Sequence, residues 1–417
     1  MRIRDAGVLT ITGLTLLAPL RSQIAPPQAV AWSQLSPVNG VPGVRPGGQW
    51  GTSAVYDVAS GQTIVFGGIG AVTTTVWARS NGDTQWSAVL TGEPSPAQRY
   101  SHTAVHDSTN SRMIVFGGSG SDCLNDVWVL SNANGVGTPT WLQLAPGGTP
   151  PTARTLHNAV YDAPGNRMLV FGGRNCSNQY NNEVWELSHA NGLGGTPIWR
   201  QLTPGGGPSI RSGSSAIYDS SVDRMTIFGG SDGTSQFNDV WVLSNTAGAN
   251  PLWNQLFPGG AIIGGRMMHT AVYDSAGQRM IVFGGNPSSA NGNFYVLEDA
   301  VGSNSAPRWT QLTPAGAPGP GSRYAHAAVY DAVGNRMIVY GGYSFERGFF
   351  LDTWTLTGAN GQTAVTAVSV TPPNAAVAAN SAQTLQFVYN DFLGVADLTT
   401  TWAWITPSFA NGGAGTC

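Results

Sequence analysis

The chain has 417 residues, of which 19 are Lys or Arg and 22 are Asp or Glu, and its formal net charge is −3. Lysine is absent, and charged residues make up only 10% of the chain, so the sequence lacks the basic surface that nucleic-acid binding requires. Hydrophobic residues at 41% and aromatic residues at 10% exclude a disordered chain. No apolar run is long enough to predict a membrane-spanning helix.

The N-terminus has the features of a secretory signal peptide. Arg2 and Arg4 precede an apolar stretch over residues 6–20, which is too short to cross a bilayer but typical of a signal-peptide core. Small residues at Ala29 and Ala31 suit cleavage, so we predict a signal peptide over residues 1–31; a stray apolar terminus is the alternative. The expected location is therefore secreted, cell-surface or periplasmic.

An internal repeat dominates the rest of the chain. A hydrophobic run that ends in Gly-Gly occurs six times, at intervals of 50 to 57 residues. The six copies are residues 63–68, 113–118, 168–173, 225–230, 280–285 and 337–342. Such a period is the signature of a repeat architecture, in which each unit buries its apolar surface against its neighbours.

Each repeat contains several short strand-like runs. A segment that ends in Asp precedes the Gly-Gly run, and a segment with an aromatic residue follows it, as in residues 125–131. Four units then close with Trp-x-Gln-Leu, as in residues 141–144. Turn residues separate these runs, and no stretch of helical length shows a 3.6-residue apolar period. Four-stranded antiparallel units at this period predict the blades of an all-β propeller.

The Gly-Gly pair, the third-strand aromatic residue and the fourth-strand Trp resemble the kelch repeat, over roughly residues 32–361. The resemblance implies a six-bladed kelch-type β-propeller. The sixth unit ends at residues 352–358 without a Trp-x-Gln-Leu segment, and an unused copy of that segment lies at residues 32–35. The N-terminal strand is thus expected to complete the last blade and to close the ring, which would cover two open sheet edges.

Repeated residues are interpreted as structural. An Arg-x-x-His pair, such as Arg99 and His102, recurs before the first strand of four units. A ring of histidines could bind a metal or an anion. A side chain that recurs in most blades, however, more often has a structural role that every blade needs. Arginine is suited to pairing with a buried carboxylate. Likewise, 11 of the 14 tryptophans lie on third or fourth strands and predict packing between blades, rather than a sugar-stacking platform.

Functional residues are expected where the loops depart from the repeat. Alternation of the strands places the loops between strands 4 and 1 and between strands 2 and 3 on one face. The 2–3 loops of blades 3, 4 and 6 differ most, and they supply the candidate ligand-binding residues Arg174, Tyr180, Phe237, Tyr343, Phe345, Glu346 and Arg347. The alternative for blade 6 is that Phe349 and Phe350 plug the propeller mouth or pack on the C-terminal segment.

Three cysteines are present, at positions 123, 176 and 417. Cys123 and Cys176 fall in the 2–3 loops of adjacent blades, so an inter-blade disulfide between them is one prediction and free thiols are the other. Their spacing matches no zinc motif. The partner of Cys417 stays open.

The repeat stops near residue 361. Residues 364–373 and 383–391 alternate as strands do, residues 400–405 form a third candidate strand, and the three resemble the opening strands of a bacterial Ig-like domain. Residues 362–417 are too few for a whole sandwich, so we expect a partial Ig-like segment or a truncated chain.

These observations predict an exported, monomeric binding module that takes a protein or a glycan on the face with the 4–1 and 2–3 loops, without nucleic acid, cofactor or metal. No G-x-S-x-G motif, P-loop or dinucleotide fingerprint is present. The kelch resemblance also implies a competing function, a sugar-modifying enzyme of the mutarotase or copper radical oxidase kind. Neither enzyme pattern is matched residue by residue, which favours binding over catalysis.

Overall fold

The computed structural model describes residues 30–36, 46–70, 74–286, 293–303, 306–315 and 319–361, together with four short strands further along the chain. The chain divides into two units, of which one comprises Val30–Asn360 and the other the remaining residues. No helix long and apolar enough to cross a membrane occurs within the described residues. The predicted signal peptide lies outside them, apart from Val30 and Ala31.

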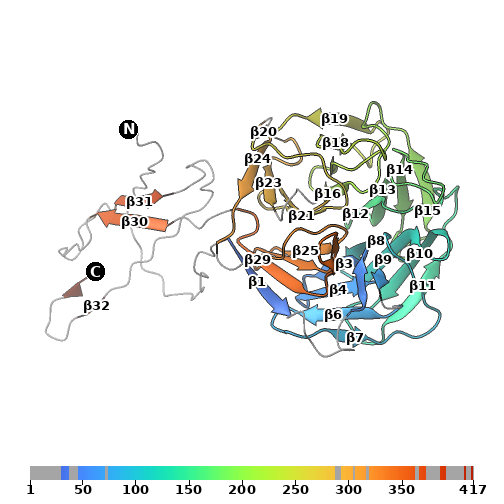
Figure 1. Cartoon of the computed structure of the whole chain (residues 1–417), viewed down its shortest axis with the longest axis horizontal. Coiled ribbons are helices and arrows are strands. Elements are labelled where there is room, and N and C mark those ends of the chain that lie inside the picture. The colour runs from blue at the N-terminus through green and yellow to red at the C-terminus, as the bar shows by residue number, and fades with distance from the viewer. Residues whose placement is uncertain are drawn as a thin grey trace. The chain divides into compact units, whose positions relative to one another are not determined.

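Six four-stranded antiparallel sheets surround one axis and form the blades of a propeller (Figure 1). Blades 1 to 3 consist of β3 (Ser53–Asp57), β4 (Gln62–Phe66), β6 (Val76–Ser80) and β7 (Ser87–Val89); β8 (Thr103–Asp107), β9 (Arg112–Ser119), β10 (Cys123–Ser131) and β11 (Thr140–Leu144); and β12 (Asn158–Asp162), β13 (Arg167–Phe171), β14 (Val184–Ser188) and β15 (Ile198–Leu202). Blades 4 to 6 consist of β16 (Ser215–Asp219), β17 (Arg224–Phe228), β18 (Val240–Ser244) and β19 (Leu252–Leu256); β21 (Thr270–Asp274), β22 (Arg279–Phe283), β23 (Phe294–Glu298) and β24 (Arg308–Leu312), with β20 (Gly259–Gly260) added alongside; and β25 (Ala327–Asp331), β26 (Arg336–Tyr340), β29 (Thr353–Thr357) and β1 (Ala31–Ser36).

The ring closes as the sequence predicts. Strand β1 pairs antiparallel with β29, with Trp32 opposite Leu356, so the N-terminal strand is the outermost strand of the last blade. Blade 6 therefore also has four strands, and its outermost strand precedes blade 1 in the chain. The six-bladed, all-β prediction is confirmed.

Packing between blades repeats around the ring. The aromatic residue that ends each second strand contacts the fourth-strand Trp of the next blade, with ring centroids 4.9 to 5.4 Å apart. The six pairs are Phe66–Trp141, Phe116–Trp199, Phe171–Trp253, Phe228–Trp309, Phe283–Trp32 and Tyr340–Trp86. Second strands are buried on both faces because each lies between two neighbouring blades, which explains their continuous apolar runs. The predicted packing role of these tryptophans is confirmed.

The repeated arginines are structural as well. Four of them are buried and form ion pairs of 2.6 to 2.7 Å with an acid at the start of the third strand of the same blade. The pairs are Arg99–Asp126, Arg154–Glu183, Arg211–Asp239 and Arg323–Asp352. Arg266 of blade 5 lies instead over the ring of Tyr295, at 5.2 Å. Each arginine also donates to the carbonyl of the first glycine of its Gly-Gly pair, which ties the first strand to the 2–3 loop.

Beyond the propeller, β30 (Thr366–Thr371) pairs antiparallel with β31 (Gln386–Asn390), at the first two predicted strands of the C-terminal segment. A short pair, β32 (Ser408–Phe409) and β33 (Gly415–Thr416), follows. The third predicted strand, residues 400–405, and Cys417 lie outside the described residues. The Ig-like character of the segment stays a prediction.

Candidate functional site

A ring of backbone hydrogen bonds surrounds the propeller axis at one end of the channel. The residue two positions before each first strand donates its N–H to the carbonyl of the equivalent residue in the preceding blade, at 2.7 to 3.0 Å. The six residues are Gly51, Ser101, Leu156, Gly213, Met268 and Ala325, and all have φ between 50 and 67°. A left-handed backbone conformation costs about 1–2 kcal/mol at a non-glycine residue. Four of the six residues are not glycine, and the closed ring of hydrogen bonds stabilises this conformation in them.

A second set of contacts, between side chains, follows the backbone ring around the axis. The hydroxyl of Ser53, Thr103, Ser215 or Thr270 contacts the Nε2 atom of the histidine in the next blade at 2.7 to 2.8 Å. Blade 4 has Ser214 in place of the histidine, and there the preceding blade supplies the longer Asn158, which donates to Ser214 at 2.6 Å. The two exchanges compensate in length, which preserves contact between the blades. At the junction of blades 6 and 1 the residues are Ala327 and Thr52, and this contact is absent.

The ring histidines are neutral structural groups. Burial, together with the nearby Arg154, lowers the pKa of His157 to about 3, and burial beside Arg323 does the same for His326. Burial also lowers the pKa of His102 and His269 well below the usual range. Among the described residues, no group of three or more His, Cys, Asp or Glu side chains is arranged to hold a metal ion.

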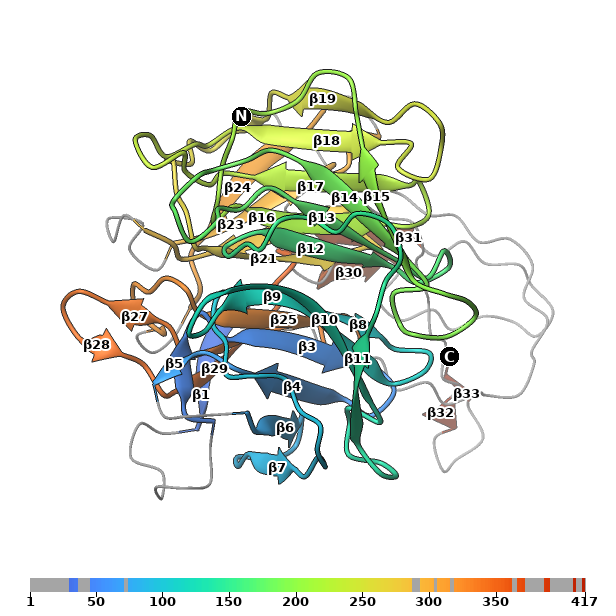
Figure 2. The same ribbon diagram turned by 90° about the vertical axis from the view of Figure 1, so that its right-hand side faces the viewer.

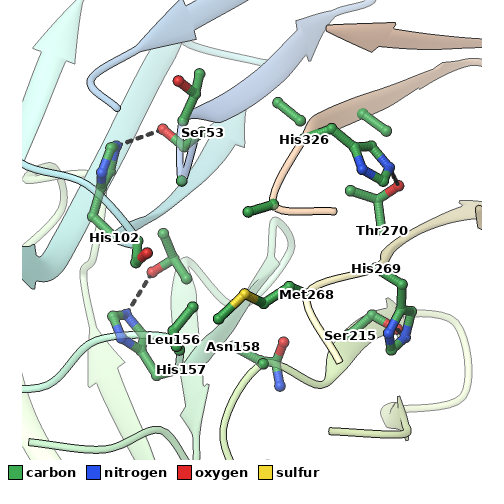
Figure 3. Close-up of a pocket in the computed structure, with 18 of the residues that line it drawn as sticks. Ser53, His102, Leu156, His157, Asn158, Ser215, Met268, His269, Thr270 and His326 are labelled. Carbon is green, nitrogen blue, oxygen red and sulfur yellow. Dashed lines mark hydrogen bonds between the residues drawn. The ribbon is translucent and has the colours of Figure 1, made fainter. Parts of the chain in front are cut away.

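Within these rings lies a cavity of about 250 Å³, lined by all six blades (Figure 3). The side chains of Leu156 and Met268 point toward its middle (Figure 3). The second residue of every first strand is alanine, and all six alanines line the cavity: Ala54, Ala104, Ala159, Ala216, Ala271 and Ala328. No Asp, Glu or Arg is among the residues that line this cavity, and its polar groups are hydroxyls, the amide of Asn158 and four neutral imidazoles.

The 4–1 and 2–3 loops lie on the same face, here named the loop face. In blades 3 to 6 a residue of the 4–1 loop forms a β-bridge with a residue between the second and third strands, as Thr155 does with Arg174 and Tyr324 with Tyr343; in blade 2, Tyr100 pairs with Ser119 at the end of β9. The central cavity opens among these loops. Both candidate regions described next, one at blades 1 to 3 and one at blade 6, are on the loop face.

Arg174 lines a smaller hollow of about 160 Å³. Trp50 and Tyr100 form part of its wall, with ring centroids 5.6 Å apart. Ser101, only 7% exposed, also lines it, and its hydroxyl has no hydrogen-bond partner. Arg174 takes part in none of the ion pairs among the described residues; its guanidinium lies 5.9 Å from the ring of Tyr180. The hollow thus combines aromatic walls, an unpaired cation and a buried hydroxyl.

Two other candidates of this region have packing roles. The phenol of Tyr180 lies against Gly233 in the neighbouring 2–3 loop, where a Cβ atom would come within 2.9 Å of its oxygen. Phe237 is partly buried beneath the guanidinium of Arg211, at 4.3 Å, as Phe350 is beneath Arg323 at 4.0 Å. The structure therefore does not bring Phe237 and the hollow together.

The blade 6 candidates form a small hairpin, β27 (Tyr343–Ser344) and β28 (Gly348–Phe349), that extends from the loop face at the left of Figure 2. Phe345 is 68% and Phe349 50% exposed. Tyr343 contacts both phenylalanines, and Tyr324 stacks beside Tyr343 and Phe345. Glu346 and Arg347 are exposed at the tip. Of the two residues expected to plug the mouth, Phe350 is buried and Phe349 faces solvent.

Cys123 and Cys176 form a disulfide with Cα atoms 5.7 Å apart. It joins β10 of blade 2 to the 2–3 loop of blade 3, next to the hollow that Arg174 lines. Sequence reasoning missed Trp50, Tyr100 and Ser101, which complete that hollow. The available signal was that Trp50 is one of the three tryptophans outside the regular third-strand and fourth-strand positions.

Six radial four-stranded sheets with a channel and a loop face define a six-bladed β-propeller. The chain matches the family described as the KLHDC2/KLHL20/DRC7 Kelch-repeats domain over residues 51–187 and 135–298, which together span more than half of it. The chain belongs to this Kelch-repeat family. Among solved structures it is similar to that titled "Structure of YjhT", with a TM-score of 0.55 and 14% identity over 82% of this chain and 99% of that one, which shows a shared fold.

Curated relatives resemble the propeller at low identity. Adagio protein 3 of Arabidopsis thaliana is 26% identical over 60% of this chain and 40% of its own length. Host cell factor 2 of Homo sapiens is 29% identical over 51% of this chain and 27% of its own. The Rab9 effector protein with kelch motifs of Xenopus laevis is 27% identical over 52% and 57%. The chain thus matches little more than half, or less, of each relative.

Proposed function

We propose that this protein is an exported binding module whose loop face captures a protein or carbohydrate ligand. The observation that carries the proposal is the blade 6 hairpin, where Phe345 and Phe349 are exposed beside two charged residues on a rigid aromatic base. Large apolar groups held in water at a rigid site are typical of interaction surfaces.

Three further observations support the proposal. The Kelch-repeat relatives include one whose name describes an effector of Rab9, which is a protein partner. The Cys123–Cys176 disulfide suits an oxidising compartment, as the apolar N-terminal stretch does. The Arg174 hollow gives the same face a place for a polar group of the ligand.

The test compares exposed apolar residues on opposite faces. The double variant Phe345→Ala/Phe349→Ala should lose ligand capture in glycan-array and pull-down screens of the purified propeller, with an unchanged Tm. The matched control is Val136→Ala/Val333→Ala, which removes residues 68% and 87% exposed in the 3–4 and 1–2 connections of the opposite face. Equal loss of capture in both variants would refute the assignment of the binding surface to the loop face.

A further inference from the structure

Arg79 on β6 breaks the repeat inside the propeller. In the other five blades the equivalent position is a leucine that is 0% exposed: Leu130, Leu187, Leu243, Leu297 and Leu356. Arg79 itself is only 2% exposed. A charged side chain therefore occupies a site in the junction of blades 6 and 1 that the rest of the molecule fills with hydrocarbon.

The guanidinium of Arg79 has few partners. Its Nη1 atom donates to the backbone carbonyl of Asp83 at 2.5 Å, and the group lies 5.9 Å from the ring of Trp86. Its Nε and Nη2 atoms are buried without a hydrogen-bond partner. The Asp83 side chain is exposed and forms no ion pair with it within the described residues. Two buried N–H donor groups of a cation thus lack an acceptor.

Two hydroxyls in the same junction are equally unpartnered. Thr63 lies directly opposite Arg79 in the β4–β6 ladder, and its Oγ1 atom is buried without a hydrogen-bond partner. Thr355 on β29 of blade 6 is also buried, and its Oγ1 atom has none either.

The repeat places these three residues together. Their counterparts at the junction of blades 2 and 3 are Val129, Met168 and Leu187, which belong to one buried cluster. At the junction of blades 5 and 6 the counterparts Val296, Met337 and Leu356 do the same. Thr355, Thr63 and Arg79 therefore converge across the junction of blades 6 and 1, where polar groups replace all three hydrocarbons.

The buried positive charge of this cluster favours the binding of a negatively charged group. Burial lowers the pKa of Arg79 to about 10, which leaves it protonated at neutral pH. The exposed carboxylate of Asp83 partly offsets this effect and raises the pKa, whereas Arg336, a like charge nearby, lowers it further. A buried cation without a counter-charge is strongly destabilising, whereas unpaired N–H and O–H donors gain most from a charged acceptor.

We propose that a small monovalent anion, chloride or one of similar size, binds between blades 6 and 1, held by Arg79 Nε and Nη2 and by the hydroxyls of Thr63 and Thr355. The anion bridges the first and last blades and so contributes to closing the ring. Because the unfolded chain has no such site, the anion stabilises the folded propeller by mass action.

The experiment is thermal unfolding of the purified full chain at constant ionic strength while sodium chloride replaces sodium gluconate, whose anion is too large for the site. The wild-type Tm should rise by several degrees with chloride. Arg79→Leu, which restores the residue of the other blades, should show no rise. Arg308→Leu, the same charge change at an exposed residue of β24, should respond as the wild type does.

A second pair of variants keeps the test decisive if Arg79→Leu does not fold. Thr63→Met and Thr355→Val restore the residues of other blades while retaining Arg79, and each should weaken the chloride response. Crystals soaked in bromide should give an anomalous peak beside Arg79 and Thr63. An equal chloride response in wild type and Arg79→Leu, or only an ordered water at this position, would overturn the proposal.

Discussion

The junction of blades 2 and 3 and the junction of blades 6 and 1 are built from the same repeat positions, but their interiors differ. Between blades 2 and 3 the cluster is hydrocarbon and aromatic throughout, and includes Phe116, Met168 and Leu187. Between blades 6 and 1 the equivalent residues are Tyr340, Thr63 and Arg79, and the apolar cluster shrinks to a few side chains around Trp86. The series of hydroxyl–histidine contacts between neighbouring blades is also interrupted there.

The difference shows that the junctions between blades can contribute unequally to the stability of the propeller. Each blade contacts only its neighbours, so one junction can change without disturbing the others. Within blade 6 the closure is supplied by the β1–β29 backbone ladder, and apolar burial against blade 1 is limited to the cluster around Trp86. The weak junction is therefore tolerated where a hydrogen-bonded strand already holds the two ends of the propeller together.

The largest expected effect is at the apolar junction. Phe116→Ala removes a side chain with 0% exposure that contacts Trp199 and His157. It should lower the free energy of unfolding by about 3–5 kcal/mol, measured by urea titration. At the junction of blades 6 and 1, Tyr340→Phe removes only a hydroxyl that donates to the Pro46 carbonyl and should cost about 1 kcal/mol. A loss from Phe116→Ala as small as that from Tyr340→Phe would contradict the apolar packing role of Phe116.

The disulfide reinforces the apolar junction further. Cys123→Ser/Cys176→Ser frees a connection between residues 53 positions apart and should cost about 2–4 kcal/mol, measured under the same conditions. Adding a reductant to the wild type should lower its stability by a similar amount and leave the double variant unchanged. An unchanged free energy of unfolding in the double variant would contradict a stabilising role of the disulfide.

Replacing the buried charge at the junction of blades 6 and 1 should raise the stability of the protein instead of lowering it. In chloride-free gluconate, Arg79→Leu should raise the free energy of unfolding by about 1–4 kcal/mol, because a packed hydrocarbon replaces a buried charge that lacks its counter-ion. Leu187→Arg is the reverse exchange at the apolar junction and should be severely destabilising. A loss of stability of Arg79→Leu in gluconate would show that a group of the protein itself stabilises the guanidinium.

Acid should weaken the apolar junction through its histidine. His157 has a folded pKa of about 3, below its unfolded value of 6.5, so between these values the unfolded chain binds a proton that the folded chain does not. Its stabilising contribution is complete above pH 6.5 and falls with decreasing pH by at most about 1.4 kcal/mol per pH unit. His157→Gln should show a shallower loss of stability from pH 6 to 4 than the wild type. Parallel curves would be the contrary result.

The smallest effect concerns the interrupted ring. Thr52→His with Ala327→Thr would install at the junction of blades 6 and 1 the contact that Thr103 and His157 make at 2.8 Å. The double variant should gain about 0.5–1.5 kcal/mol in unfolding titrations. Thr103→Ala should lose a similar amount, and a gain without a matching loss would show that the two sites are not equivalent.

Much of the fold could be predicted because the same sequence pattern occurs six times and predicts the same strands in each blade. The Gly-Gly runs located the second strands, and the unused Trp-x-Gln-Leu copy at residues 32–35 revealed which strand closes the ring. The candidate site was harder to predict. Its hollow joins Trp50, Tyr100 and Arg174 from three different blades, and spacing along one blade carries no signal for such a contact.

The sequence by itself determined the number of blades, the closing strand and the structural role of the recurring Arg and Trp residues. These follow from local pattern, since each blade is a contiguous segment with the same turns and strand alternation. Only the tertiary structure decided that Phe350 is buried while Phe349 is exposed, and that Asn158 compensates for Ser214. It also showed that the Nε and Nη2 atoms of Arg79 and the hydroxyls of Thr63 and Thr355 are buried without hydrogen-bond partners. These outcomes depend on side chains from neighbouring blades that meet across a junction, and their partners are fixed by packing around the axis.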